Sequence, residues 1–315
     1  MMDNSNKKNT VFVMASTGYN KPLVESHGYK VYSPYKGSGL LSRIVREIWF
    51  TIPLLNNKFW FDKSIVSSQP NYIIIYDSLI TKEYLIWIHE LFPNAQINYC
   101  YNNMVGKARH LFPRDIPEFV RVWTYDEYDS RKYKLNLYPY CITRKSYPQK
   151  KHSKYDVFFV GKDKGRGEWL CAFEKRLCSM GLKTKFIITK NGRLSKKKPY
   201  YQKEIPYNEV LNYNSRSKSI LNIVMSNQEG VTMRDIEATS MSIKLITNNK
   251  HIKNKDFYNP SNIFILGERD ETEIVDFLSS EFENIPNRIF DIHTFKNRID
   301  TITSQSIVIN EREIR

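Results

Sequence analysis

The chain has 315 residues, of which 41% are hydrophobic and 14% aromatic. A chain of this size and composition can bury a large core or form two ordinary domains, which excludes an intrinsically disordered protein. No run of residues approaches the roughly 18 apolar positions that a membrane-spanning helix needs. The polar start from Met1 to Thr10 lacks the apolar segment of a signal peptide, so a cytoplasmic location is expected.

The formal net charge of +15 is unevenly distributed. Residues 1–150 carry +8 and residues 151–220 carry +11, whereas residues 221–315 carry −4. A positive field of this kind attracts nucleic acid, an anionic membrane surface or a phosphorylated small molecule, and charge alone does not distinguish them. The four cysteines form no C-x-x-C pair, which favours reduced, buried thiols over a disulfide framework or a zinc site.

Short runs of β-branched and aromatic residues recur along the chain, separated by stretches typical of helices. The expected strands cover residues 10–14, 72–76, 96–101, 120–124, 155–160, 184–189, 220–224, 244–247 and 263–266. Near-continuous apolar strands that alternate with helices indicate α/β folding with parallel sheets covered on both faces. Residues 271–282 and 292–302 are expected to form helices near the end of the chain.

A polar, basic segment from Thr143 to Lys154 interrupts this pattern and is typical of a linker. A new strand begins directly after it, at Tyr155. We therefore predict two Rossmann-like domains, over residues 1–150 and 151–315, with the last helix able to return to the first domain.

Two segments carry the residues expected to bind a phosphorylated ligand. In the first, the strand at 155–160 ends in Gly161 and is followed by Lys162 and Arg166 before a helix over residues 168–180. A glycine turn, nearby cations and a helix N-terminus together suit a diphosphate, although the spacing matches neither a Walker nor a dinucleotide-binding motif. A solvated basic turn is the alternative.

The second segment follows the strand at 220–224. Gly230 opens a turn, Thr232 can cap a helix, Arg234 stands near the start of that helix, and Glu237 lies about one turn further on, where it could hydrogen-bond a ribose. An ordinary capped helix whose Glu and Arg face water is the alternative.

The stretch from Gln228 to Asn248 resembles the donor-binding region of GT-B-type glycosyltransferases of bacterial surface-polysaccharide (O-antigen and capsule) synthesis, with its glycine, Thr-Met-Arg, Glu-Ala pair and Lys-Leu-Ile-Thr strand. The residues from Tyr155 to Arg166 are similar to the first strand and phosphate turn of the second domain of those enzymes. The resemblance implies that Glu237 holds the ribose and that Arg234 and Thr232 lie by the diphosphate or sugar. It also implies that Lys162 and Arg166 neutralise the leaving nucleoside diphosphate. By the same resemblance, residues 1–150 form an acceptor-side domain and residues 151–315 a nucleotide-sugar donor domain. Glu229 and Glu237 have the E-x7-E spacing of many retaining members.

An inverting transfer needs a base for the acceptor hydroxyl. Asp77, at the carboxyl end of the strand at 72–76, is the first candidate, and Asp126 is the second; Glu127 and Asp129 compete with them. Asp77 could instead cap a helix that starts at Leu79. Gly18 closes the loop after the first strand and could permit close approach of a ligand. The chain contains no D-x-D triplet, which argues against the alternative of a GT-A enzyme that holds its nucleotide diphosphate through a divalent cation. We expect neither a metal nor another cofactor.

Residues 40–61 show an apolar stripe at helical spacing and end in Phe59-Trp60-Phe61. Such a stripe is either part of the core or a surface that contacts the inner face of the cell membrane. Taken together, the sequence predicts a metal-independent enzyme that moves a sugar from a nucleotide-sugar donor to a lipid-linked or oligosaccharide acceptor, with no nucleic-acid partner. A basic nucleic-acid-binding module and a catalytically idle GT-B-like scaffold are the alternatives.

Overall fold

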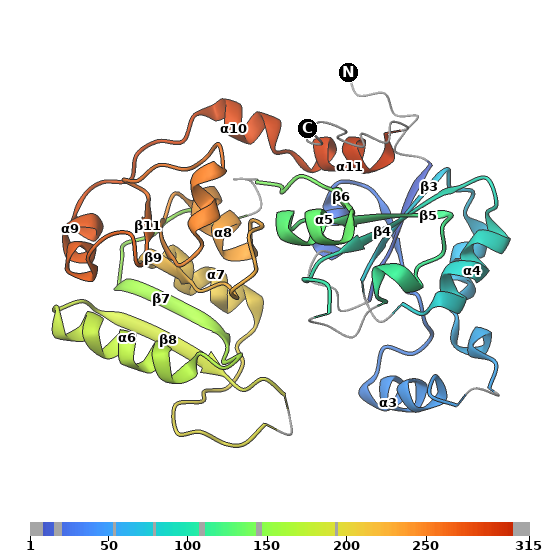
Figure 1. Ribbon diagram of the computed structural model, residues 1–315, viewed down its shortest axis with the longest axis horizontal. Helices are drawn as coiled ribbons and strands as arrows, with labels where there is room; N and C mark the ends of the chain where they lie inside the picture. Colours follow the sequence, from blue (N-terminus) through green and yellow to red (C-terminus); the bar gives the residue numbers. More distant parts are fainter. Residues whose placement is uncertain are drawn as a thin grey trace. The chain divides into compact units, whose positions relative to one another are not determined.

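The computed structural model describes residues 9–15, 21–52, 55–77, 80–106, 111–142, 147–192 and 195–304 (Figure 1). The chain divides into two compact units. Unit 1 comprises Met1–Pro139 and Phe295–Arg315, and unit 2 comprises Tyr140–Thr294. The segment from Thr143 to Lys154, predicted as a linker, thus belongs to unit 2, where the backbone N–H groups of Lys151 and Lys154 donate to the carbonyls of Ser215 and Arg216, each at 2.7 Å. Residues 143–146 of that segment lie outside the described residues.

Unit 1 contains a six-stranded sheet in the order β2-β1-β3-β4-β5-β6, with all neighbours parallel. Its strands are β1 (Thr10–Val13), β2 (Lys30–Tyr32), β3 (Tyr72–Tyr76), β4 (Gln96–Tyr101), β5 (Val120–Thr124) and β6 (Asn136–Leu137). Its helices are α2 (Lys21–Ser26), α3 (Leu40–Trp49), η1 (Asn57–Trp60), η2 (Lys63–Ser67), α4 (Lys82–Leu91), η3 (Pro113–Asp115), α5 (Glu127–Tyr133) and α11 (Phe295–Thr303).

Both faces of the first sheet are covered. Ile73 and Ile75 of β3 belong to one buried cluster together with Tyr84 and Ile88 of α4. On the opposite face Phe12 of β1 stacks on Phe295 of α11, with 6.1 Å between ring centroids. Because successive side chains of a strand point to opposite faces, strands buried on both sides need apolar residues at almost every position. The run Ile73-Ile74-Ile75 has this pattern.

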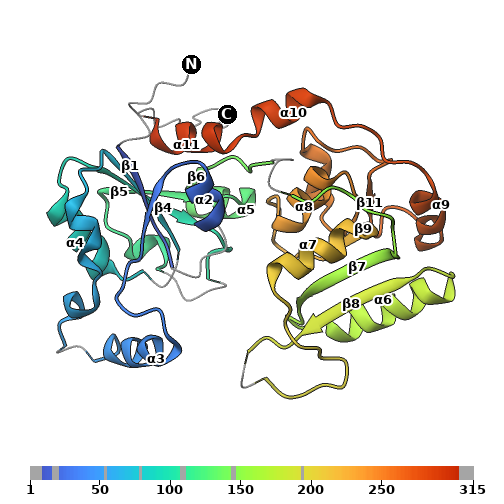
Figure 2. The ribbon, with the colours of Figure 1, turned by 180° about the vertical axis from the view of Figure 1, so that it is seen from behind.

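Unit 2 contains a five-stranded parallel sheet in the order β11-β10-β9-β7-β8 (Figure 2). Its strands are β7 (Tyr155–Lys162), β8 (Thr184–Thr189), β9 (Ser217–Asn222), β10 (Lys244–Thr247) and β11 (Ile263–Ile265). Its helices are α6 (Gly167–Ser179), α7 (Tyr207–Ser215), α8 (Met233–Met241), η5 (Lys250–Asn254), η6 (Glu271–Glu273), α9 (Ile274–Ser279) and α10 (Asn287–Ile292).

The alternation along β9 shows how the second sheet is buried. Leu221 belongs to a cluster with Phe173 of α6 and Phe277 of α9. Its neighbour Ile220 belongs to another cluster, with Ile236 of α8 and Ile289 of α10. The sheet therefore has a hydrophobic core on each face, as in a doubly wound α/β domain.

The two sheets have the same strand order. In each, the second strand along the chain lies on one side of the first and the third lies on the other, so the connections leave in opposite directions. The predicted fold class, two Rossmann-like α/β domains, is confirmed. In such sheets a crevice forms at the carboxyl ends of the two strands between which the order reverses. These strands are β1 and β3 in unit 1, and β7 and β9 in unit 2.

Three features differ from the sequence-based expectations. The short strands β2 and β6 were not predicted, because three and two residues give too little alternation to recognise. Cys178 is exposed and Cys171 is half-buried, whereas Cys100 and Cys141 are buried as expected. The helix expected within residues 40–61 ends at Trp49, and its apolar stripe does not enter the core, since Leu41, Ile44 and Ile48 are exposed. None of the helices in the described ranges is both long enough and apolar enough to cross a bilayer.

Candidate functional site

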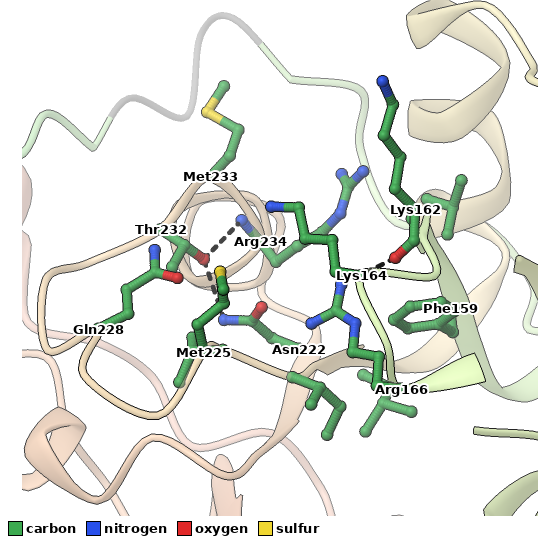
Figure 3. A pocket seen from close by; sticks show the side chains of 15 residues that line it. Phe159, Lys162, Lys164, Arg166, Asn222, Met225, Gln228, Thr232, Met233 and Arg234 are labelled. Atoms are coloured by element: carbon green, nitrogen blue, oxygen red, sulfur yellow. Dashed lines mark hydrogen bonds between the residues drawn. The ribbon is translucent and has the colours of Figure 1, made fainter. Parts of the chain in front are cut away.

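A pocket of ≈ 310 Å³ lies in unit 2 (Figure 3). It is lined by the end of β7 and the turn after it, by the end of β9 and the loop after it, and by the start of α8. β7 and β9 are the two strands between which the strand order reverses. The pocket thus occupies the position where doubly wound sheets bind their ligands.

The turn between β7 and α6 is held in place by Asp163. The carboxylate of this buried residue accepts hydrogen bonds from the N–H of Gly167 at 2.7 Å, from the Tyr201 hydroxyl at 2.6 Å and from the Tyr200 hydroxyl at 3.1 Å. Burial works to raise the pKa of Asp163, but these hydrogen bonds and the charge of Lys198 lower it below its ordinary value. The carboxylate is therefore anionic at neutral pH. Its role is structural, because its hydrogen bonds hold the turn in place.

Two residues of this turn have a left-handed backbone: Lys164 with φ 49° and Gly165 with φ 85°. Such a conformation is uncommon for a residue with a side chain and is typically retained at functional sites. Gly167 permits the close packing behind the turn, since a Cβ atom there would lie 2.6 Å from the Tyr200 ring and 2.8 Å from Cγ of Asp163. The backbone path of the turn thus depends on a glycine at position 167 and brings the Lys164 side chain to the pocket wall.

Four cationic side chains line the pocket: Lys162, Lys164, Arg166 and Arg234. They come from the turn after β7 and from α8 (Figure 3). Burial, and then repulsion from Arg166 and Lys162, lowers the pKa of the Lys164 ammonium group. Burial likewise lowers the pKa of the Arg166 guanidinium, against the attraction of Asp163. An anion in the pocket would reverse both effects, because it would stabilise the charged form of each group.

The guanidinium of Arg166 lies over the Phe159 ring, with 5.5 Å between its Cζ and the ring centroid. Nη2 of Arg166 donates to the Lys162 carbonyl at 3.5 Å. Its Nε is buried and has no hydrogen-bond partner among the residues that the structure describes. A buried donor without a partner costs free energy, and a ligand oxygen would satisfy it.

The start of α8 forms the opposite wall. Thr232 is the N-cap, and its hydroxyl accepts from the N–H of Arg234 at 3.2 Å. Asp235 completes a capping box by accepting from the N–H of Thr232 at 2.7 Å. Asn222, the last residue of β9, donates to both Thr232 (2.9 Å) and Asp235 (2.7 Å). This network fixes the positive end of the helix dipole at the pocket, which favours an anionic ligand.

Asp235 also makes the stability of the fold pH-dependent. Burial raises the pKa of this fully buried carboxyl to about 6, against its hydrogen bonds from Thr232 and Asn222. As the pH rises, the unfolded chain, with an ordinary pKa near 4, therefore releases this proton at a lower pH than the folded state does. Stability contributed by this group is complete at low pH and is lost as the pH rises from about 4 to about 6. We expect the melting temperature of the wild type minus that of Asp235→Asn to fall across this window; a constant difference would contradict the assignment.

Arg234 forms an ion pair with Glu237, one helical turn further along α8. The Glu237 side chain has no exposed surface, and its oxygens also accept from the Tyr207 hydroxyl at 3.0 Å and from the Asn214 amide at 2.8 Å. Glu237 does not line the pocket. In this arrangement the carboxylate can act on a ligand only through Arg234, whose orientation it fixes.

The sequence-based donor residues can now be placed. Five of the seven line the pocket: Gly161, Lys162, Arg166, Thr232 and Arg234. Gly230 is buried in the loop that leads to α8, and Glu237 lies behind Arg234. Glu229, the first residue of the E-x7-E pair, is likewise outside the pocket lining, with 3.7 Å between its Oε1 and Nε2 of His251.

Several lining residues were not predicted from the sequence. Phe159, Lys164, Asn222, Met225, Gln228 and Met233 all contribute side chains (Figure 3). The rule that ligands bind at the carboxyl ends of strands could have found Asn222. No sequence pattern predicts the left-handed backbone of Lys164, which brings its side chain to the pocket. Asn248 clamps the loop that carries Met225 and Gln228, since its side chain exchanges two hydrogen bonds with the Val224 backbone, at 2.7 and 3.2 Å.

The candidate bases of unit 1 differ in their surroundings. Asp77 follows β3 at the reversal of strand order, and its Oδ2 accepts from the N–H of Asn103 at 3.3 Å. It does not cap α4, which begins at Lys82 and is capped by Thr81. Asp126 has no exposed surface and caps α5 by accepting from the N–H of Asp129 at 3.1 Å. Gly18 lies outside the described residues. A catalytic role for Asp77 or Asp126 stays a prediction.

Within the described ranges no group of three or more His, Cys, Asp or Glu side chains is placed to hold a metal ion. The metal independence of any reaction at this site stays a prediction.

No family model and no curated protein sequence matches the chain. The solved structures that are similar to it include the following two. An α1,3-fucosyltransferase with GDP is 12% identical, with a TM-score of 0.42 over 98% of this chain and 94% of the other. A glycotransferase of kitacinnamycin is 9% identical, with a TM-score of 0.41 over 93% of this chain and 88% of the other. Similarity at this level assigns no activity to this chain.

Proposed function

We propose that the chain is a glycosyltransferase that binds the diphosphate of a nucleotide-sugar donor in the pocket of unit 2. The observation that carries the proposal is the convergence of Lys164, Arg166 and Arg234 with the N-terminus of α8 where the strand order of the sheet reverses. Four cations around one cavity repel one another, and a diphosphate would relieve that repulsion. The resemblance of residues 155–166 and 228–248 to the donor region of GT-B enzymes supports the same ligand.

The remaining lining suits the other parts of such a donor. Met225, Met233 and Phe159 place apolar surface beside the cations, and Gln228 adds an amide that can both donate and accept. A nucleoside diphosphate has this combination of a charged end and a flat, partly apolar end. Glu237 is proposed to act as a positioning residue that holds Arg234 in place rather than as a direct ligand of the ribose.

In the proposed reaction the acceptor hydroxyl oxygen forms a bond to the anomeric carbon of the sugar. The bond from that carbon to the diphosphate breaks, and the diphosphate leaves with the electron pair. Lys164, Arg166 and the amides of α8 stabilise the negative charge that develops on it. The hydroxyl proton passes to a base, for which Asp77 is preferred over Asp126, because the carboxylate of Asp126 is already used to cap α5.

The acceptor is proposed to be a lipid-linked or free oligosaccharide of a bacterial surface polysaccharide, such as O-antigen or capsule, made at the cytoplasmic side of the membrane. Unit 1 is proposed as the acceptor-side domain, and the transfer is proposed to be metal-independent.

The test is calorimetric titration of the full chain with UDP, GDP, CDP and dTDP and with the matching monophosphates. We expect one diphosphate to bind at least tenfold more tightly than its monophosphate, and the corresponding nucleotide sugar to be hydrolysed slowly by the wild type. Binding of a nucleoside diphosphate without hydrolysis of any nucleotide sugar would favour a GT-B-like scaffold that lacks catalytic activity. Tight binding of a single-stranded oligonucleotide, with no diphosphate binding, would favour the nucleic-acid module and overturn the proposal.

A further inference from the structure

Helix α3 has the reverse of the orientation usual for a surface helix. Its apolar residues recur three and four positions apart and form one stripe, which in a surface helix normally faces the core. Here the stripe faces solvent: Leu41 is 75% exposed and Ile48 is 58% exposed. Arg46, on the opposite side of the helix, is buried instead.

Contacts on the inner side hold this orientation. Nη1 of Arg46 donates to the carbonyls of Lys36, at 3.2 Å, and Gly37, at 3.4 Å. Its guanidinium also lies 4.7 Å from the centroid of the Tyr35 ring. Turning the apolar stripe inward would expose this packing and break the hydrogen bonds. The reversed orientation is therefore built into the fold of unit 1.

The exposed apolar surface extends beyond α3. We define the α3 face as the six exposed side chains Leu41, Ile44, Val45, Ile48, Ile52 and Phe59. Phe59 is joined to the helix through its ring stack on Trp49, with 5.4 Å between centroids. Figure 1 and Figure 2 both show α3 at the lower end of unit 1, away from the strands. A contiguous exposed apolar surface of this kind marks an interaction site.

The charges around the α3 face indicate what covers it. Residues 36–66 contain five basic and two acidic side chains. Lys36, Arg43, Lys58 and Lys63 are exposed. Lys58 pairs with Glu90 at 2.8 Å, and Arg46 points inward. Two copies paired through this face would bring like charges together, because a two-fold interface repeats the same surface on both sides. An anionic bilayer avoids this cost, since its headgroups attract the cations while its acyl boundary accepts the apolar side chains.

We propose that the α3 face docks unit 1 on an anionic membrane surface, with the helix lying in the plane of the interface. Leu41, Ile44 and Ile48 enter the boundary between headgroups and acyl chains, and Arg43 contacts lipid phosphates. This binding needs no sugar donor, so it can be tested independently of the proposed transfer.

The test is flotation of the full chain with vesicles of phosphatidylcholine alone and of phosphatidylcholine with about 30% phosphatidylglycerol, a composition chosen to give the negative surface potential of a cytoplasmic leaflet. We expect the wild type to bind the anionic vesicles at least tenfold more tightly than the neutral ones, and the double substitution Leu41→Asp/Ile48→Asp to abolish binding. The matched control is Val275→Asp/Ile292→Asp, which adds the same charge at two exposed apolar positions of unit 2 (38% and 53% exposed) and should bind as the wild type does.

Two further measurements make each outcome decisive. Arg43→Glu, a change at an exposed position, should weaken binding to anionic vesicles at least tenfold and leave the melting temperature unchanged, which separates lipid contact from folding. Light scattering of the wild type should give the mass of one chain. Vesicle binding that survives Leu41→Asp/Ile48→Asp, absence of binding by the wild type, or a dimer that this double substitution dissociates would each overturn the proposal.

Discussion

Replacing Arg166 by alanine is expected to weaken the binding of inorganic pyrophosphate by about 10- to 100-fold, which is the loss of one or two hydrogen bonds to a charged group. Nε of Arg166 is buried without a partner among the described residues, and the guanidinium carbon lies 5.5 Å from the centroid of the Phe159 ring at the pocket wall. A phosphate oxygen would complete its hydrogen bonding. Pyrophosphate is the appropriate probe because it reports on the phosphate site alone, whatever the nucleoside. Calorimetric titration measures the change.

Arg176→Ala is the matched control for this prediction. Arg176 lies on α6, the helix that Arg166 precedes as the N-cap residue, but it pairs with Glu271 at 2.8 Å and is outside the pocket lining. Its removal takes away the same charge, so any general effect of charge on the affinity appears in both variants. Equal losses in Arg166→Ala and Arg176→Ala would mean that pyrophosphate is attracted by the net charge of the chain and not bound in this pocket.

The strands of the second sheet could be predicted because they are buried on both faces. β8 and β10 begin and end at the predicted residues, because each has an uninterrupted apolar centre, Phe186-Ile187-Ile188 and Leu245-Ile246, with a polar residue at either end. β9 was predicted to begin too late: it covers Ser217–Asn222, and its first three residues, Ser-Lys-Ser, are polar. The hydroxyl of Ser219 donates to the carbonyl of Asp156 on the neighbouring strand β7 at 2.8 Å, so the tertiary fold satisfies this polar group and the sequence carries no apolar signal there.

The sequence predicts which residues lie at the site where their position follows from the order of the strands. It does not predict the direction of a side chain that depends on tertiary packing. Arg166 and Thr232 follow the strands that meet at the reversal of strand order, so two separate sequence segments could be assigned to one ligand. The direction in which Glu237 points depends instead on its partners Tyr207 and Asn214, which α7 supplies from 30 and 23 residues away. No local pattern in the sequence reports such a contact. The apolar stripe of α3 likewise allowed two interpretations, because the spacing of apolar residues does not determine which side of the helix the fold buries.

Replacing Glu237 by alanine is expected to lower the free energy of unfolding by about 3 to 5 kcal/mol, the usual cost of removing one member of a buried ion pair. The carboxylate has no exposed surface and serves Arg234, Tyr207 and Asn214 together. Without it the Arg234 charge loses the buried carboxylate that pairs with it, beside three other cations of the pocket. Denaturant titration measures the loss. Glu25→Ala is the control, because Glu25 forms an exposed pair with Lys21 at 3.6 Å and should change stability by less than about 1 kcal/mol.

Glu237→Gln separates a positioning role from direct contact with a ribose. Glutamine keeps the shape and can still accept from Tyr207, but it loses the charge that holds Arg234. If Glu237 acts through Arg234, affinity for pyrophosphate and for the preferred nucleoside diphosphate should fall by the same factor, about tenfold for a weakened charged hydrogen bond. If the carboxylate contacts the ribose, only the nucleoside diphosphate should lose affinity, because pyrophosphate has no sugar. A loss confined to the nucleotide would restore the role that the sequence resemblance implies, and would require Glu237 to leave its present partners when the donor binds.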